Sequence, residues 1–306
     1  MSKTSILKTI ISKIMSLNGL TDSGKMSLAG LLAWGRKSLA GLDIGTAGLD
    51  ARVLLAHVTK RPAEHILAHG EEAVDARTTA AYQALIEKRR NYAPVAYLTG
   101  HCEFMGLDFE VDENVLIPRP ETEILVEETM SFIKKTGARK ALDLCTGSGC
   151  IGVSLAYYRE NLAVTASDIS ERALEVARRN ATRLGVADRV EFVRSDLFEI
   201  LSAPEKYDII VSNPPYIPDW AISGLPPSVK DYEPRLALSS GERGVDFYER
   251  IFAGAKDFLN PGGVLMLEIG FDQGDAVREA AVNQGYRVEG IVKDLEGRDR
   301  VVKCQL

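Results

Sequence analysis

The second half of the chain alternates short apolar runs with amphipathic helical segments, and this restricts the fold more than any other feature. Such alternation predicts a mostly parallel sheet with helices on both faces. The last stretch, residues 286–306, reads as two adjacent strands. We therefore expect an α/β fold with a seven-stranded sheet that has one antiparallel strand at its edge. The other expected strands lie at 140–147, 163–170, 189–198, 207–216 and 262–270.

Two different patterns precede this alternation. Residues 26–94 have helical periodicity that is interrupted by glycines and by Pro62, which predicts a small helical bundle. Residues 95–119 alternate apolar and polar side chains over short runs with turn residues between them, which predicts a β-hairpin linker. A helix is expected from Pro120, because proline suits a first helical turn. Residues 120–306 are then expected to form the larger α/β domain.

The first 25 residues form a segment of their own. Isoleucines recur at helical spacing with lysines between them. The lysines interrupt the apolar stretch that a secretory signal needs. A mitochondrial presequence normally carries arginine, and the first arginine here is Arg36. Three interpretations stay open: a short surface helix, a targeting leader, or an extension ahead of a natural start at Met26.

The charge balance bears on the class of partner. The net charge is -6, from 37 basic and 43 acidic residues. Proteins that hold DNA or RNA along its length are usually basic, because phosphate contacts dominate their affinity. We therefore expect no direct nucleic-acid binding.

Metal, disulfide and membrane features are not expected. The chain has four cysteines and no CxxC pair, and scattered thiols suit a reducing cytoplasm. His65 and His69 share a helix face but lack the acid of an HExxH motif. No apolar run approaches the roughly 18 residues of a membrane span.

A glycine turn and an acidic residue predict a nucleotide-type ligand. The first strand runs into Gly147-Ser148-Gly149, and such a turn lets a ligand approach the backbone and a helix N-terminus. Asp168 lies 19 residues after Gly149, at the end of the second strand. There it can accept hydrogen bonds from both ribose hydroxyls.

The third strand ends in a further candidate for the ligand's base. Asp196 can accept a hydrogen bond from an adenine amino group, with Leu197 or Phe198 on the ring; a helix N-cap is the alternative for Asp196. The spacing of Gly147, Gly149 and Gly152 also fits a dinucleotide fingerprint, so the glycines do not distinguish NAD from S-adenosylmethionine. The cofactor candidates from these loops are Cys145, Thr146, Gly147, Ser148, Gly149, Asp168, Asp196 and Leu197.

The fourth strand ends in Asn213-Pro214-Pro215-Tyr216, where open sheets bind ligands. An amide nitrogen is a poor nucleophile with two N–H donors. The Asn213 side-chain oxygen can accept a hydrogen bond from one N–H group, and a backbone carbonyl, that of Pro214, from the other. Together they would stabilise the positive charge that the nitrogen gains on methylation. The prolines stiffen the loop, and Tyr216 can pack on a planar substrate. A simple two-proline turn is the alternative.

These residues give the chain a resemblance to a known family. It resembles the PrmC/HemK protein-glutamine N5-methyltransferases, which act on peptide chain release factors, from about Met26 to Leu306. NPPY is shared by amino-methyltransferases in general, whereas IPRPETE between hairpin and helix is more specific. The shared segments are LDARVLLAHV, PVAYLTGHCEF, VLIPRPETEILVE, LDLCTGSGCIGVSLA, SNPPYI, EPRLALSSGERGVDFYERI, LEIGFDQG and GRDRVV.

The resemblance implies a Rossmann-like fold, an activity and a set of site residues. The substrate would be the glutamine of the Gly-Gly-Gln loop that enters the ribosomal peptidyl transferase centre, and its methylation would modulate translation termination. S-adenosylmethionine would become S-adenosylhomocysteine, and residues 26–94 would bind the release factor. The family's cofactor residues correspond to Gly147, Gly149, Asp168 and Asn213. Residues Phe104, Arg119 and Glu123 would line the site.

Three features depart from the family pattern. Cys145 stands where glycine is usual, and a positive φ there would cost about 1 kcal/mol or more. Leu197 stands where a larger ring often covers adenine, and the leader has no counterpart. Glu233 and Arg235 follow NPPY closely and are additional substrate-binding candidates.

Three other functions remain as alternatives. A related family methylates a glutamine of a large-subunit ribosomal protein and shares a CTGSGC-like turn, but it lacks the PETE continuation. A DNA or RNA adenine-N6 methyltransferase also uses NPPY, and it would have to flip out a base. A binding module without catalysis is the third; the intact NPPY argues against it.

Overall fold

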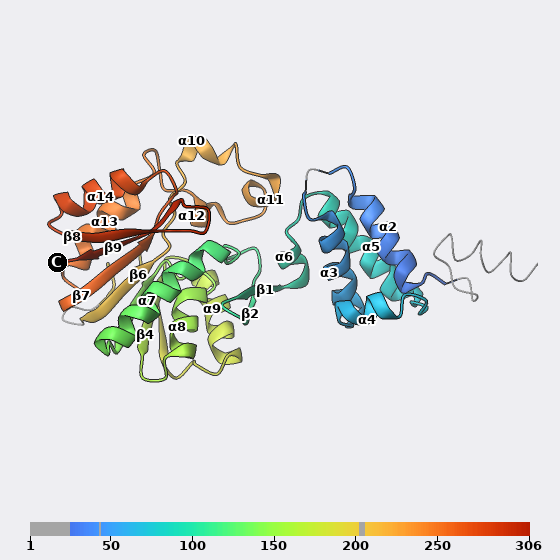
Figure 1. Ribbon diagram of the computed structural model, residues 1–306, viewed down its shortest axis with the longest axis horizontal. Coiled ribbons are helices and arrows are strands. Elements are labelled where there is room, and N and C mark those ends of the chain that lie inside the picture. The colour runs from blue at the N-terminus through green and yellow to red at the C-terminus, as the bar shows by residue number, and fades with distance from the viewer. Residues whose placement is uncertain (1–24, 43, 202–205) are drawn as a thin grey trace, which may run out of the picture. The chain divides into compact units, whose positions relative to one another are not determined.

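The computed structural model describes residues 25–42, 44–201 and 206–306 (Figure 1). Contacts divide the chain into two compact units, Met1–Thr99 and Gly100–Leu306. The leader predicted over residues 1–25 lies outside the described residues except for Lys25. None of the described helices is long and apolar enough to span a membrane.

The N-terminal unit is a bundle of helices around a leucine-rich core. Its helices are α2 (Leu28–Leu39), α3 (Ala47–Thr59), α4 (Ala63–Ala68), α5 (Ala76–Arg90) and α6 (Val95–Thr99). Ser27 and Asp75 cap α2 and α5 by accepting hydrogen bonds from backbone N–H groups of the first turn. Inside the bundle, Arg89 Nε lies 2.7 Å from Asp50 Oδ2, and both side chains are buried.

The linker differs from the prediction at its start. Residues 95–99 were expected to belong to the hairpin and instead form the short helix α6. Pro94 explains this, because its carbonyl accepts a helical hydrogen bond from Leu98 N (3.1 Å) and five residues are too few to show a helical period. The hairpin itself is confirmed as β1 (His101–Phe104) and β2 (Leu107–Glu110). Met105 and Gly106 form its turn, both with positive φ.

The C-terminal unit contains the predicted seven-stranded sheet, in the order β5-β4-β3-β6-β7-β9-β8. All pairs are parallel except the two that involve β9. The strands are β3 (Lys140–Leu144), β4 (Ala163–Asp168), β5 (Val190–Arg194), β6 (Tyr207–Ser212), β7 (Leu259–Glu268), β8 (Arg287–Lys293) and β9 (Asp299–Gln305).

The antiparallel strand lies one place inside the edge, which corrects the prediction of an antiparallel edge strand. The C-terminal strand β9 inserts between β7 and β8, and β8 is the edge. Burial explains the order. Val301, Val302 and Cys304 of β9 are fully buried, whereas no residue of β8 is. A hairpin pattern alone does not tell which of its two strands pairs with β7 and which forms the edge.

Two layers of helices cover the sheet. Helices α7 (Glu123–Thr136), α8 (Cys150–Tyr158) and α9 (Glu171–Arg183) lie on one face, and α13 (Asp246–Ala255) and α14 (Gly274–Asn283) on the other (Figure 1). The helix expected from Pro120 begins as the 3-10 turn η1 (Pro120–Thr122). Short helices α10 (Asp219–Ile222), α11 (Pro227–Lys230) and α12 (Arg235–Leu238) follow β6.

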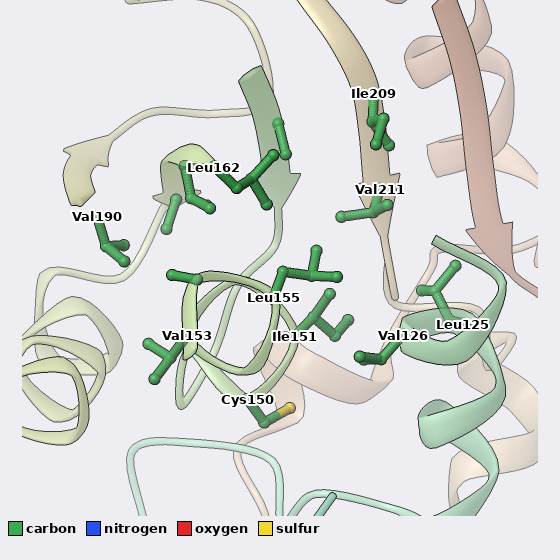
Figure 2. Close-up of a cluster of buried hydrophobic side chains, with 14 of the residues drawn as sticks. Leu125, Val126, Cys150, Ile151, Val153, Leu155, Leu162, Val190, Ile209 and Val211 are labelled. Carbon is green, nitrogen blue, oxygen red and sulfur yellow. The ribbon is translucent and has the colours of Figure 1, made fainter. Parts of the chain in front are cut away.

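The apolar core fixes where the strands end. Figure 2 shows Ile151 and Leu155 of α8 facing Ile209 and Val211 of β6 in one buried cluster. This packing aligns the carboxyl ends of neighbouring strands, so that Leu144 of β3 lies in register with Ser212 of β6. The strand order reverses between β3 and β6, and this is the place where open parallel sheets bind their ligands.

Candidate active site

A cavity opens at the carboxyl ends of β3, β4, β5 and β6. The loops after these strands form its wall, together with segment 114–122, part of 234–237 and two residues of α13. In the described residues, no group of three or more His, Cys, Asp or Glu side chains is arranged to hold a metal ion. The predicted residues that line the cavity are Arg119, Cys145, Thr146, Gly147, Ser148, Asp168, Asp196, Leu197, Asn213 and Pro215.

The glycine turn is built around a buried carboxylate that sequence reasoning missed. Asp143 Oδ2 accepts hydrogen bonds from Thr146 Oγ1 (2.5 Å) and Gly152 N (2.9 Å). Burial raises the pKa of Asp143 to about 7. A Cβ on Gly152 would lie 2.9 Å from Asp143 Oδ2. This glycine, which fits the dinucleotide spacing, therefore has a packing reason.

Gly149 is set back from the cavity, although it was predicted to bind the cofactor. Its φ is 81°, and a Cβ there would meet Ala177 of α9 at 3.0 Å. The residue therefore lets α8 approach α9. Gly147 is the glycine that faces the cavity, and a Cβ there would meet nothing within 4 Å. The backbone at Gly147 is thus open to a ligand.

The Asp168 carboxylate is held in place by the turn that it faces. Its Oδ2 accepts a hydrogen bond from Gly147 N (2.9 Å), and its Oδ1 accepts one from Ser170 N (2.9 Å). Burial raises the pKa of Asp168. Each oxygen keeps a lone pair for a further donor. The side chain can therefore receive hydroxyl groups without having to move.

Asp196 has a partner that the sequence did not reveal. Arg250 Nη2 of α13 lies 2.8 Å from Asp196 Oδ1, and the Arg250 guanidinium lies over the ring of Phe247, 5.6 Å from its centroid. Both α13 residues line the cavity. Asp196 is no helix N-cap in the described chain, because a turn follows it, with Glu199 N donating to Asp196 O.

Leu197 is the apolar residue that this loop presents to the cavity, with a φ of 50°. Phe198, the alternative for packing on a base, instead stacks on Phe258 with ring centroids 5.1 Å apart. A leucine in the left-handed region is strained, and such strain is frequent where a side chain must face a ligand.

Only part of the NPPY loop lines the cavity. Asn213 and Pro215 line the cavity, whereas Pro214 and Tyr216 do not. Asn213 Nδ2 donates to Thr122 Oγ1 (3.2 Å), and the Tyr216 hydroxyl donates to Glu268 Oε1 (3.5 Å). The Tyr216 hydroxyl therefore faces a buried carboxylate, and packing of its ring on the substrate stays a prediction.

Gln273 fixes this loop from behind. Its Nε2 donates to the carbonyls of Tyr216 (2.9 Å) and Gly244 (3.0 Å), and its Oε1 accepts from Gly270 N (2.9 Å). Sequence reasoning did not find Gln273, and the only available signal was its place in the shared segment LEIGFDQG.

Two further predicted site residues lie outside the cavity wall. Phe104 is 1% exposed and packs edge-on against Phe109 in the apolar core. The Glu123 carboxylate accepts a hydrogen bond from Met105 N (2.6 Å) and so holds the hairpin turn. Their places in the sequence, Glu123 at the end of IPRPETE and Phe104 in the hairpin before it, did not tell which side they face.

The substrate-binding candidates after NPPY have structural partners. Glu233 is 6% exposed, pairs with Arg119 and accepts from Ile117 N (3.2 Å). It thereby holds Arg119, which lines the cavity. Arg235 pairs with Asp219 (3.2 Å), and its side chain is exposed.

Cys145 has a φ of 57°, so the position does require the left-handed region. We expect Cys145→Gly to be more stable than Cys145→Ala by about 1 kcal/mol, because only glycine adopts this region without steric cost. Urea unfolding of both variants measures the difference. Ala and Gly differ only by the Cβ methyl group, so the pair reports mainly the steric cost of a Cβ at this positive φ. If the alanine variant is as stable as the glycine variant, the backbone at position 145 is not strained.

Comparison with known proteins identifies the family. A model described as PrmC N-terminal domain matches residues 30–100, and one described as methyltransferase small domain matches residues 121–223. The hMettl16 catalytic domain, solved in complex with a MAT2A 3′UTR hairpin, has a TM-score of 0.54 at 16% identity, over 76% of this chain and 82% of that one. At that identity the likeness shows the methyltransferase fold alone.

Curated relatives are much more similar. A bifunctional methyltransferase of Rickettsia typhi is 38% identical over 86% of this chain, which spans 54% of that protein. A release factor glutamine methyltransferase of Moorella thermoacetica is 44% identical over 82% of this chain and 89% of its own length. The release factor glutamine methyltransferase of Clostridium acetobutylicum is 42% identical over 83% of this chain and 89% of its own length. The chain therefore belongs to the release factor glutamine methyltransferase family.

Proposed function

We propose that this protein methylates the side-chain amide nitrogen of the glutamine in the Gly-Gly-Gln motif of peptide chain release factors. The products are N5-methylglutamine and S-adenosylhomocysteine. The observation that carries the proposal is the placement of Asn213. Its nitrogen is engaged by Thr122, which leaves its oxygen as the free acceptor on the wall of a cavity that also contains Asp168.

The cavity suits S-adenosylmethionine better than a dinucleotide. The Gly147 N–H, which in a dinucleotide site would face the pyrophosphate, donates to Asp168. Arg119 and Arg250 are each paired with a carboxylate. A site with this charge balance favours a cationic sulfonium over an anionic pyrophosphate. Gly147, Asp168, Asp196 and Leu197 would hold the cofactor, which supplies an electrophilic methyl group when bound.

The protein's part in the reaction is to orient the amide. Asn213 Oδ1 and the Pro214 carbonyl would accept the two N–H groups of the target glutamine and stabilise positive charge as the nitrogen gains a methyl group. Held in this way, the amide nitrogen would take the methyl group that S-adenosylmethionine supplies when bound, with S-adenosylhomocysteine as the leaving group, and would then lose a proton to water. No general base is needed before the transfer.

The unit around residues 26–94 is assigned to binding of the release factor, as in the family that the chain resembles. The assignment agrees with the division of the chain near Thr99, which leaves the whole cavity in the C-terminal unit. Nucleic acid is a poorer substrate, because the chain is acidic overall and both arginines on the cavity wall are neutralised by carboxylates.

The test is methyl transfer from labelled S-adenosylmethionine to purified release factor. A release factor whose Gly-Gly-Gln glutamine is replaced by alanine is the matched control. We expect label on the first and none on the second, and mass spectrometry of the loop peptide gives the modified residue. Ribosomal protein, DNA and RNA are separate arms. Label on one of them, with an unlabelled release factor, would refute the proposal and identify the substrate class.

A further inference from the structure

Two buried residues behind Asn213 form a chain of hydrogen bonds that ends in a carboxylate. Asn213 Nδ2 donates to Thr122 Oγ1 (3.2 Å), and Thr122 Oγ1 donates to Glu268 Oε2 (2.6 Å). Thr122 is 2% exposed and Glu268 1% exposed. The three residues come from the loop after β6, from η1 and from the end of β7. None of these contacts is local in sequence.

The direction of each hydrogen bond follows from the carboxylate. An ionised Glu268 only accepts, so the single hydroxyl hydrogen of Thr122 must point to it. Thr122 Oγ1 then offers only lone pairs to Asn213, and the Asn213 nitrogen has to face it. We propose that Thr122 and Glu268 are positioning residues that fix the Asn213 amide in one orientation, with its oxygen presented to the substrate.

This orientation matters because the two ends of an asparagine amide have opposite roles. A target amide nitrogen carries two donors, so a reversed Asn213 would place N–H against N–H. Rotation of the amide by a half turn would therefore change the site from one that binds an amide nitrogen to one that repels it. The inference rests on the proposed function for the identity of the substrate, but the fixed orientation itself depends on Thr122 and Glu268 alone.

The hydrogen-bond chain from Glu268 through Thr122 to Asn213, here called the relay, is sensitive to pH because of the surroundings of Glu268. Burial raises the pKa of Glu268 to about 7, while Thr122 and Arg300 act in the opposite direction. The other titratable groups near it are Tyr216 and Glu121, Tyr248 of α13 and Cys150 of α8. A protonated Glu268 can donate to Thr122, whose own hydrogen is then free to turn to Asn213 Oδ1. The oriented state is complete above the pKa and is lost as pH falls through it.

Substitution of the hydroxyl tests the relay directly. Thr122→Val keeps the shape of the side chain, and we expect kcat for release factor to fall about tenfold, as for one lost buried hydrogen bond, while KM and the affinity for S-adenosylhomocysteine stay within about twofold. Thr122→Ser should restore kcat. Thr129→Val is the matched control, because Thr129 is buried on α7 and donates to the Leu125 carbonyl, away from the cavity. A Thr122→Val enzyme with wild-type kcat would overturn the proposal, as would a serine variant equally impaired.

The pH profile separates positioning from simple support of the fold. Wild-type kcat should fall as pH drops below about 7. Thr122→Val and Glu268→Gln should each abolish this fall of kcat at low pH, because each removes a member of the hydrogen-bond chain through which protonation of Glu268 reaches Asn213. A fall of kcat that is unchanged in both variants would contradict the role of Glu268.

A substrate-free measurement keeps this inference distinct from the proposed function. The side-chain amide resonances of Asn213, assigned by their loss in Asn213→Ala, report its orientation by NMR. They should titrate near pH 7 in the wild type and be pH-independent in Glu268→Gln. If release factor is not methylated but the resonances titrate as expected, the substrate is wrong and the relay stands. Resonances that do not titrate in the wild type would refute the relay.

Discussion

Asn213→Ala is expected to lower kcat for methylation of release factor by about 10²–10³-fold, the loss typical when one preorganised group that stabilises transition-state charge is removed. Asn213 lies on the cavity wall with its nitrogen bonded to Thr122, so in the proposed reaction its oxygen would accept from the target amide nitrogen. This interaction strengthens as the nitrogen becomes positive, and the loss should therefore appear in kcat more than in KM. Single-turnover transfer of labelled methyl groups measures it.

Two controls make this result specific. S-adenosylhomocysteine should bind Asn213→Ala with nearly wild-type affinity in calorimetry, because Asp168 and the glycine turn are unchanged. Asn161→Ala removes an exposed asparagine just before β4, at the opposite end of the sheet, and should leave kcat unchanged. If Asn213→Ala keeps more than a tenth of the wild-type rate, Asn213 is not the group that orients the amide.

The positions of Asn213 and Asp168 could be predicted because they depend only on topology. Each follows a strand of the alternating half, and parallel strands bring their carboxyl ends to one edge. The structure places Asn213 just after Ser212, whose neighbour in register is Leu144 of β3, and the glycine turn begins there. Sequence alone thus brings the cofactor turn and NPPY together.

The support of the site could not be predicted, because it depends on contacts between distant segments. Thr122 and Glu268 are 146 positions apart, and Arg250 of α13 pairs with Asp196 in the loop after β5. Nothing in the local pattern around these residues distinguishes a buried partner from a surface charge. Their pairing follows from strand register and helix packing, which single-sequence patterns do not contain.

Side-chain direction limits the prediction in a similar way. Phe104 is near the right loop but faces the core, and the Tyr216 hydroxyl faces Glu268. In a strand, a shift of one residue moves a side chain to the opposite face. In an irregular segment such as 111–119, the sequence has no periodicity from which the direction of a side chain can be predicted.

Asp168→Ala is expected to weaken binding of S-adenosylmethionine by about 1–3 kcal/mol, or roughly 5- to 150-fold in Kd, since partner groups lose their acceptor in a buried place. Two effects combine in this loss. The ribose hydroxyls lose the carboxylate, and the N–H groups of Gly147 and Ser170, which it accepts at 2.9 Å each, lose the group that shapes the turn. Calorimetric titration with S-adenosylhomocysteine measures the sum.

A 2′-deoxy analogue of S-adenosylhomocysteine separates the two effects. If Asp168 binds the ribose, removing the hydroxyl should cost affinity in the wild type and little in Asp168→Ala, because the two changes remove one interaction. Asp188→Ala, which removes an exposed carboxylate near the amino end of β5, should behave as the wild type with both ligands. Equal losses in wild type and Asp168→Ala would mean that Asp168 only shapes the turn. The ribose would then be held by another group, and the closest analogy between this cavity and a dinucleotide site, an acid at the end of the second strand, would have a purely structural cause.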